Sequence, residues 1–219
     1  MSLPPFHAWL FDLDGTLVDS MKGVVDCMKV TAKEVGGEVT NETELRASFG
    51  RGLMNTLVPW IPEGKLDEAL ERYEENFPKY VKTQISLVSG AKELLDWVKA
   101  RELPIGVVTG NKIYEAQGLF DATGLHEYFN FDHVVCADSI PFQKPSPEPV
   151  LECCRRLGVE PSDQVVFVGD SEHDIRAGKL AGVRTIAVLG GSSPKERLLA
   201  AEPDFVFESL EEVFRQISC

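Results

Sequence analysis

Two aspartates two positions apart form the first stretch of the sequence whose residue types could do chemistry. Asp12 and Asp14 follow the apolar segment 8–11, and Gly15 comes directly after them. The apolar segment predicts a buried strand that ends in a tight turn. Alternate residues of an extended segment point to the same side, so the two carboxylates can converge on one cation or phosphoryl group. Gly15 would let the backbone approach that group closely.

A calcium loop is the first alternative for this stretch. Such a loop needs oxygen ligands at alternate positions and a closing glutamate. Asp12, Asp14 and Thr16 begin the required run, but Val18 interrupts it, Gly15 falls too early and no glutamate closes it. The sequence therefore favours a phosphoryl or metal site over a calcium loop or a plain polar turn.

Further polar residues follow later apolar segments. Thr109 follows segment 105–108, Asp170 follows segment 165–168, and Lys144 lies in a loop before a predicted helix. Each alone could be an ordinary cap or loop residue. In open α/β sheets, however, ligands bind beyond the carboxyl ends of the strands. Carboxylates, a hydroxyl, amide donors and one ammonium group are what phosphoryl transfer requires, so we expect these residues to form one site.

The elements that would position these residues alternate between helix and strand from residue 90 onward. Strands are predicted at 105–108, 132–136, 165–168 and 185–189, with helices at 91–101, 112–122, 147–157 and 175–181; a weak strand at 205–207 and a helix at 210–217 follow. Such a series implies right-handed crossovers and a parallel sheet with helices on both faces. The predicted class is therefore α/β.

Residues 20–87 show no clear strand and predict an inserted helical unit. Apolar residues recur at helical spacing from 21 to 35, after a predicted cap at Asp19 and Ser20. Short helices are expected at 40–49 and 53–58, and a longer one runs through 66–77 with a kink at Pro78. We therefore expect a core of residues 1–19 and 88–219, with a helical unit of residues 20–87.

Composition and charge narrow the classes of function. The 219 residues are 43% hydrophobic, which supplies a sizeable core. A net charge of −13 argues against nucleic acid or an anionic membrane as the main partner, because both require basic patches. The sequence has no apolar run of membrane-spanning length and no signal-peptide pattern at its start, so we expect a cytoplasmic protein. Its oligomeric state, monomer or homodimer, stays open.

The cysteines and histidines give no independent site. The five cysteines form neither a Cys-x-x-Cys pair nor an even framework, and the four histidines lack zinc spacing. We expect reduced, mostly buried thiols at these positions: Cys27, Cys136, Cys153, Cys154 and Cys219.

The order and spacing of four motifs resemble those of the haloacid dehalogenase superfamily of aspartate-nucleophile hydrolases. The motifs are Asp12-Leu13-Asp14-Gly15-Thr16, Val107-Val108-Thr109-Gly110, Lys144-Pro145-Ser146-Pro147 and Gly169-Asp170-Ser171-Glu172-His173-Asp174. The resemblance covers nearly the whole chain. It implies a Rossmann-like core and, for an insert between the first two motifs, a helical cap that closes over the site. The helical pattern of residues 20–87 agrees with such a cap.

The resemblance also implies catalytic roles. Asp12 would be the nucleophile that forms an aspartyl phosphate. Asp14 would protonate the leaving oxygen and then activate the water that hydrolyses the intermediate. Thr109 and Gly110 would bind the transferring phosphate, and Lys144 would neutralise charge on it and on Asp12.

A magnesium site follows from the same resemblance. Mg²⁺ would be held by Asp12, by the backbone carbonyl of Asp14 and by Asp170. Asp174 would orient Lys144 or a metal-bound water. The dehalogenating branch of the family lacks a second acid such as Asp14, so haloacid chemistry is set aside.

Within the family, residues 19–23 resemble the Asp-Ser-x-x-Gly run of phosphoglycolate phosphatase-like enzymes. The phosphohexomutase branch usually carries a cap histidine where this chain has Val24, so a phosphatase is favoured over a mutase of the β-phosphoglucomutase type. Arg51 is either a solvated loop arginine or a residue that reaches into the site and binds an anionic group of the substrate. His173 and Lys22 are further candidates for the same rim, where solvated side chains are the alternative. The expected substrate is a small phosphate monoester; phosphoglycolate, sugar phosphates, nucleoside monophosphates and pyrophosphate all remain open.

Two non-enzymatic functions are kept as alternatives. Phosphoaspartate receiver domains share an acidic pocket, a hydroxyl and a lysine at strand ends, but they need no large helical insert. An idle phosphate-binding module is disfavoured because every motif residue is present. Rapid turnover of any phosphate monoester would exclude both.

Overall fold

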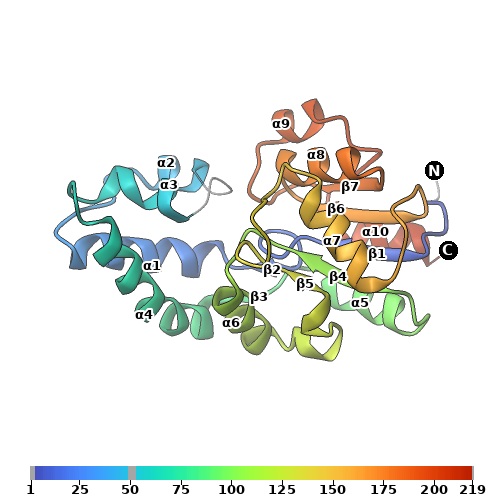
Figure 1. Ribbon diagram of the computed structural model, residues 1–219, viewed down its shortest axis with the longest axis horizontal. Helices are drawn as coiled ribbons and strands as arrows, with labels where there is room; N and C mark the ends of the chain where they lie inside the picture. The colour runs from blue at the N-terminus through green and yellow to red at the C-terminus, as the bar shows by residue number, and fades with distance from the viewer. Residues whose placement is uncertain (1–2, 49–52, 219) are drawn as a thin grey trace.

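A six-stranded parallel sheet lies at the centre of the computed structural model, which describes residues 3–48 and 53–218 (Figure 1). The strands run in the order β5 (Val134–Val135), β4 (Ile105–Val108), β1 (Ala8–Phe11), β6 (Val165–Gly169), β7 (Arg184–Val188) and β8 (Phe205–Phe207). Each neighbouring pair is parallel. The first strand therefore occupies the middle of the sheet, and the predicted α/β parallel sheet is confirmed.

Helices cover both faces of this sheet. They are α5 (Ala91–Lys99), α6 (Ile113–Thr123), α7 (Glu148–Leu157), α8 (Glu172–Ala181), α9 (Lys195–Ala200) and α10 (Leu210–Ile217). Alternate residues of β1 belong to different hydrophobic cores: Trp9 and Phe11 to one, Ala8 and Leu10 to the other. Since successive strand residues point to opposite faces, both faces of β1 are packed. All four residues are fully buried.

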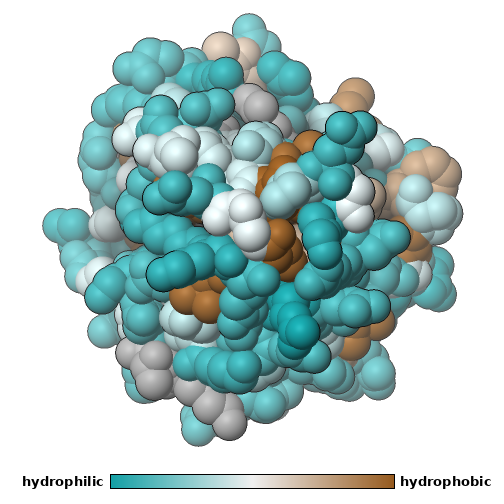
Figure 2. Space-filling model, turned by 90° about the vertical axis from the view of Figure 1, so that its left-hand side faces the viewer, coloured by the Kyte–Doolittle hydropathy of each residue, from teal (hydrophilic) through white to brown (hydrophobic). Residues whose placement is uncertain are grey.

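A lobe of helices lies to one side of the sheet (Figure 1). We call α1–α4 the helical lobe: α1 (Met21–Glu34), α2 (Glu42–Ala47), α3 (Leu53–Leu57) and α4 (Leu66–Gln84), with the 3₁₀ turn η1 (Val58–Trp60) between the last two. The long helices α1 and α4 pack against each other. The end of the molecule formed by this lobe is mostly hydrophilic, with small hydrophobic patches (Figure 2).

Two short strands join the lobe to the sheet. β2 (Val18–Asp19) precedes α1 and β3 (Ser86–Leu87) follows α4, and the two pair antiparallel. The chain therefore leaves the core at β2 and returns to it at β3, and these two strands lie side by side. None of the helices in the described ranges is long and apolar enough to cross a membrane.

Several short elements differ from the sequence predictions. The β2–β3 pair was not predicted because two residues give no periodicity. The six-residue α9 and the three-residue 3₁₀ turns η2 (Leu125–Glu127) and η3 (Phe131–His133) are also too short for a clear period and were not predicted. The strand predicted at 132–136 is wrong at its start, since residues 132 and 133 belong to η3 and β5 contains only Val134 and Val135. Ser20 is the N-cap residue of α1 as predicted, but its side chain makes no cap hydrogen bond and donates to Asp14 instead.

Candidate active site

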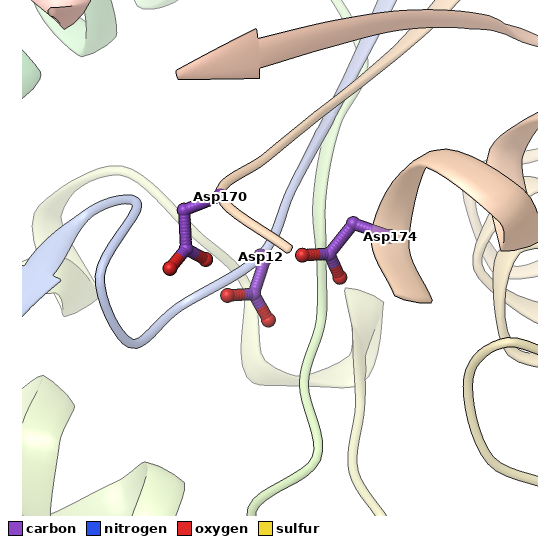
Figure 3. A group of neighbouring side chains, drawn as sticks. All are labelled: Asp12, Asp170 and Asp174. Carbon is purple, nitrogen blue, oxygen red and sulfur yellow. The ribbon is translucent and has the colours of Figure 1, made fainter. Parts of the chain in front are cut away.

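Three buried carboxylates meet at the carboxyl edge of the sheet (Figure 3). Asp12 follows β1, Asp170 follows the neighbouring β6, and Asp174 lies in the first turn of α8. One oxygen from each residue lies within 4.8 Å of the others. Their exposed fractions are 7%, 1% and 1%. The parallel pairing of β1 and β6 is what brings residues 158 positions apart in the sequence together.

Lys144 joins two of these carboxylates. Its Nζ lies 2.5 Å from Asp12 Oδ1 and 2.6 Å from Asp174 Oδ1. Nζ also donates to the carbonyl of Val108 at 3.1 Å. The other carboxylate oxygen of Asp174 accepts hydrogen bonds from the backbone and hydroxyl of Ser171, at 3.0 and 2.6 Å. The ammonium group is therefore fixed from three sides.

The Asp170 carboxylate is held by two loops. The Thr16 hydroxyl donates to Oδ1 at 3.2 Å, and the backbone N–H of Ser192 donates to Oδ2. Gly15 has φ of +80°, and a Cβ there or at Gly191 would overlap this carboxylate. These glycines are required by the close approach of the two turns to Asp170.

Burial and mutual repulsion perturb the ionisation of the group. Burial raises the pKa of Asp12 well above its usual range; Lys144 opposes that shift, while the charges of Asp174 and Asp170 add to it. Burial and the charge of Asp174 raise the pKa of Asp170 to about 6. Burial lowers the pKa of Lys144, but Asp12 and Asp174 outweigh it and hold that pKa above its ordinary value.

The donor set fits a small divalent cation. Carboxylate oxygens are the ligands that Mg²⁺ prefers. Lys144 supplies a single positive charge for three clustered carboxylates. A divalent cation would relieve the remaining repulsion, which raises the pKa of Asp12 and Asp170. The buried cluster is thus able to bind a metal.

Asp14 lies near the three carboxylates, but its hydrogen-bond partners are different. Its carboxylate accepts hydrogen bonds from the Ser20 hydroxyl and the Asn111 side-chain amide. Burial raises its pKa, although those two hydrogen bonds oppose the shift. An aspartate held in this way can carry a proton more readily than an exposed one. The sequence analysis singled out Thr109 and Gly110 but gave the neighbouring Asn111 no role.

Thr109 and Gly110 extend the site on the β4 side. Thr109 is 5% exposed, its N–H donates to the carbonyl of Val135 at 2.9 Å, and its hydroxyl accepts from the Asn111 N–H at 3.1 Å. A Cβ at Gly110 would meet no other atom within 4 Å. We call Asp12, Asp14, Lys144, Asp170 and Asp174 the sheet-edge cluster. Thr109 and Gly110 border this cluster.

A cavity of about 860 Å³ opens above the sheet-edge cluster. One side is formed by residues of α1, α4 and α6, which we call the helical wall: Val24, Met28, Tyr73, Phe77 and Glu115. Sequence reasoning named Val24 only as the position of a mutase histidine and missed the other four as site residues, because apolar residues at helical spacing have the pattern of ordinary core residues. A glutamate near a helix start likewise looks like a cap.

The three residues considered from the sequence for substrate binding lie in different places. Arg51 lies outside the described residues. His173 lines the cavity, whereas the exposed Lys22 is not among its lining residues. The cavity also contains Phe142, which is 49% exposed and was not predicted.

The described cysteines are buried and unpaired. Burial raises the pKa of Cys27 and of Cys136 to about 12, and that of Cys154 to about 11. A thiol that stays protonated is a poor nucleophile. The expectation of reduced, buried thiols is confirmed for these four residues, and Cys219 lies outside the described range.

Comparisons with known proteins agree with this geometry. A family model described as haloacid dehalogenase-like hydrolase matches residues 9–188. A phosphoglycolate phosphatase from Aquifex aeolicus is 34% identical over 201 residues, 90% of this chain and 89% of that protein. The pyrophosphatase PpaX from Oceanobacillus iheyensis is 28% identical over 204 residues, 93% of each protein.

A solved structure shows the same fold. The crystal structure of a predicted phosphoglycolate phosphatase from Haemophilus somnus superimposes with a TM-score of 0.88, at 24% sequence identity. The match covers 97% of this chain and 98% of that one. The similarity therefore includes both the sheet and the helical lobe.

Proposed function

The chain belongs to the haloacid dehalogenase-like hydrolases and is a phosphatase of that family, and we propose that it hydrolyses small phosphate monoesters through an aspartyl phosphate on Asp12. The main observation that supports this proposal is that Asp12, Asp14 and Lys144 line one cavity at the carboxyl edge of the sheet. The Rossmann-like fold, which the family implies, is the one observed.

Asp12 is the proposed nucleophile. One of its oxygens pairs with Lys144, which leaves the other for attack on phosphorus. A bond forms between that oxygen and phosphorus as the bond to the leaving oxygen breaks. Lys144 neutralises charge on the carboxylate and on the phosphoryl oxygens. The ion pair with Asp174 holds the ammonium in place, which supports a positioning role for Asp174.

Asp14 is the proposed acid and base. Its raised pKa lets it hold a proton for the leaving oxygen. Deprotonated by that step, it can then take a proton from a water molecule that attacks the aspartyl phosphate. Inorganic phosphate leaves and the Asp12 carboxylate is restored. Thr109 and Gly110 are proposed to donate hydrogen bonds to the phosphoryl oxygens during both steps.

We propose that the cluster works with Mg²⁺, which members of this family generally use. The carboxylates of Asp12 and Asp170 and the backbone carbonyl of Asp14 would hold it, and it would neutralise charge on the phosphate. Thr16 and Ser192 orient Asp170 for that purpose. The three-carboxylate group supports this proposal.

We further propose that residues 20–87 act as a cap on a core of residues 1–19 and 88–219. The helical lobe supplies one wall of the cavity and connects to the core through the paired strands β2 and β3. A cap of this kind would exclude water and contact the organic part of the substrate. Val24 lines the cavity where a mutase would carry a histidine, which supports hydrolysis over mutase chemistry.

Phosphate release tests the proposal. Wild type would be assayed on phosphoglycolate, sugar phosphates, nucleoside monophosphates and pyrophosphate, with Mg²⁺ and with chelator. We expect metal-dependent release that Asp12→Asn abolishes and that Asp163→Asn, an exposed aspartate before β6, leaves intact. Isomerisation of hexose phosphates with a bisphosphate present, without hydrolysis, would instead support the mutase. Release that is unaffected by Asp12→Asn would refute the mechanism.

A further inference from the structure

Glu115 is a buried carboxylate for which the proposed mechanism has no use. It lies in the first turn of α6 and is 5% exposed. Its Oε2 accepts a hydrogen bond from the backbone N–H of Lys112 at 2.8 Å. A glutamate with only a capping role can stay partly exposed, as Glu212 shows in the first turn of α10. Glu115 instead lines the cavity.

The surroundings of Glu115 are largely apolar and aromatic. Tyr73 and Phe77 approach from α4, and the ring of Tyr114 packs edge-on against Phe77 with centroids 6.1 Å apart. Burial is the main reason that the pKa of Glu115 rises to about 7, and a hydrogen bond from Tyr73 offsets part of the rise. A carboxylate has about four acceptor sites, so the bonds from Lys112 and Tyr73 leave room for more.

Glu115 lies on the leaving-group side of the site. Asn111, which donates to Asp14, lies two residues before the start of α6 and four residues before Glu115. The charge of Asp14 adds to the burial that raises the pKa of Glu115, so the two carboxylates are near each other. Since Asp14 is the proposed proton donor to the leaving oxygen, the organic part of the substrate would extend from Asp14 toward Glu115.

Among the described residues, the cation that acts on Glu115 lies outside the cavity: the charge of Lys112 offsets part of the rise in the pKa of Glu115, but Lys112 pairs with Glu74 at 3.0 Å and does not line the cavity. The described lysine and arginines that line the cavity each pair with another carboxylate: Lys144 with Asp12 and Asp174, Arg46 with Glu42, and Arg197 with Glu172. A leaving group that ends in a carboxylate would therefore meet like charge in a poorly solvated wall. A leaving group with hydroxyls would find an acceptor there.

Resting on the proposed function, we propose that Glu115 selects phosphate monoesters whose leaving group carries hydroxyl groups, as in sugar and polyol phosphates. Hydroxyls donate to the Glu115 carboxylate, and the apolar faces of such molecules pack against Tyr73 and Phe77. Esters of carboxylate-bearing alcohols, such as phosphoglycolate, are disfavoured by repulsion. This chain would then differ in substrate class from the phosphoglycolate phosphatases that it resembles.

The test compares three esters with matched variants. Ribose 5-phosphate carries hydroxyls, phosphoglycolate carries a carboxylate, and p-nitrophenyl phosphate carries neither. The assay would run at about pH 8, where a carboxyl of pKa about 7 is mostly ionised. Glu115→Gln keeps an oxygen to accept the Lys112 N–H but removes the charge. Glu212→Gln is the control, because Glu212 accepts a comparable hydrogen bond from the backbone N–H of Glu208 at 2.9 Å but does not itself line the cavity.

We expect wild type to have a higher kcat/KM for ribose 5-phosphate than for phosphoglycolate. Glu115→Gln should lower that ratio about tenfold, the effect of losing a charged acceptor, whereas Glu212→Gln should not change it. Thermal melting checks that both variants fold. The inference would be overturned by a wild type that prefers phosphoglycolate, or by a folded Glu115→Gln whose ratio of kcat/KM for the two esters is unchanged. In either case, turnover of p-nitrophenyl phosphate would still support the proposed function. No turnover of any ester would contradict both.

Discussion

The sheet-edge cluster and the helical wall face the same cavity but are held in place by different contacts. In the cluster, Lys144 makes three polar contacts, and both Asp170 and Asp174 accept hydrogen bonds from neighbouring turns. In the wall, Met28 and Phe77 are positioned by apolar packing. Glu115 and Tyr73 provide its polar groups.

This difference implies different roles: the sheet-edge cluster is expected to carry out the reaction, and the helical wall is expected to select the substrate. Groups fixed by several short polar contacts are preorganised, and small displacements there cost rate. Apolar walls tolerate volume-conserving changes. We therefore expect substitutions in the sheet-edge cluster to change kcat or metal affinity, and substitutions in the helical wall to change the choice of substrate.

The largest effect is expected from Lys144→Met. The variant keeps the length of the side chain but leaves the buried carboxylates Asp12 and Asp174 without their cation. We expect kcat to fall about 10²- to 10³-fold and the free energy of unfolding to fall by about 3 kcal/mol. Steady-state kinetics and urea denaturation measure the two effects.

A surface lysine provides the control for that variant. Lys92 pairs with Asp96 at 2.7 Å, but its side chain is 64% exposed, and exposed ion pairs contribute little. Lys92→Met should leave kcat and stability nearly unchanged. Equal behaviour of the two variants would mean that the buried contacts of Lys144 have no special role.

The pH dependence of stability should follow the buried carboxyls. The pKa values of Asp170 and Glu115 are about 6 and about 7 in the folded chain, above the ordinary 3.8 and 4.5. At pH values between the unfolded and the folded pKa of each group, the folded chain binds more protons than the unfolded chain. The free energy of unfolding therefore falls as pH rises through this range. With chelator present, we expect the free energy of unfolding to increase by about 3 kcal/mol from about pH 8 to about pH 5.5.

Glu115→Gln should remove about 2 kcal/mol of that pH-dependent increase, the share of a carboxyl whose pKa rises from 4.5 to about 7. Paired surface carboxyls do not contribute in this range; hydrogen bonds from Arg155 and Arg156 lower the pKa of Glu152 to about 2. Stability that instead decreases from neutral pH toward pH 5.5 would show that these carboxyls are not buried as described.

A smaller effect is expected from Gly191→Ala. The added methyl group would overlap the Asp170 carboxylate and displace it. We expect the Mg²⁺ concentration for half-maximal activity to rise about tenfold, as for other residues that orient metal ligands. Gly118→Ala in α6 is the control, because its Cβ would lie 3.6 Å from Phe77, an ordinary contact. An unchanged Mg²⁺ requirement in Gly191→Ala would argue against Asp170 as a ligand.

The smallest effect is expected from Tyr73→Phe in the helical wall. The variant removes one hydrogen bond to Glu115 and leaves the sheet-edge cluster intact. We expect KM for a hydroxyl-bearing ester to change about threefold with little change in kcat. Tyr80→Phe, on the same helix but outside the cavity lining, should change neither. A large loss of kcat in Tyr73→Phe would mean that the wall takes part in the chemistry.

The sequence predicts the sheet-edge cluster well because its signals are local. Asp12 and Asp170 each follow an apolar strand directly, Asp14 comes two residues after Asp12, and parallel strands bring their carboxyl ends to one edge. Lys144 was placed by its motif, and its contacts with Asp12 and Asp174 agree with that prediction. The strands themselves were predicted to within about two residues, as apolar runs bounded by turns.

The helical wall could not be predicted in the same way. Val24 and Met28 repeat at the spacing of any buried helix face, and nothing local distinguishes a cavity from a core. Glu115 shows only the pattern of a helix cap. Its burial arises from the packing of α4 against α6, which joins segments about 40 residues apart in the sequence.

Trapping the phosphorylated chain during turnover tests the proposed mechanism most directly. A reaction with a readily hydrolysed ester and Mg²⁺ would be quenched in acid, digested and mapped by mass spectrometry. We predict the mass of one phosphoryl group on Asp12 in wild type, and none in Asp12→Asn. Turnover without any phosphorylated residue, or with the phosphoryl group on a residue other than Asp12, would contradict the mechanism.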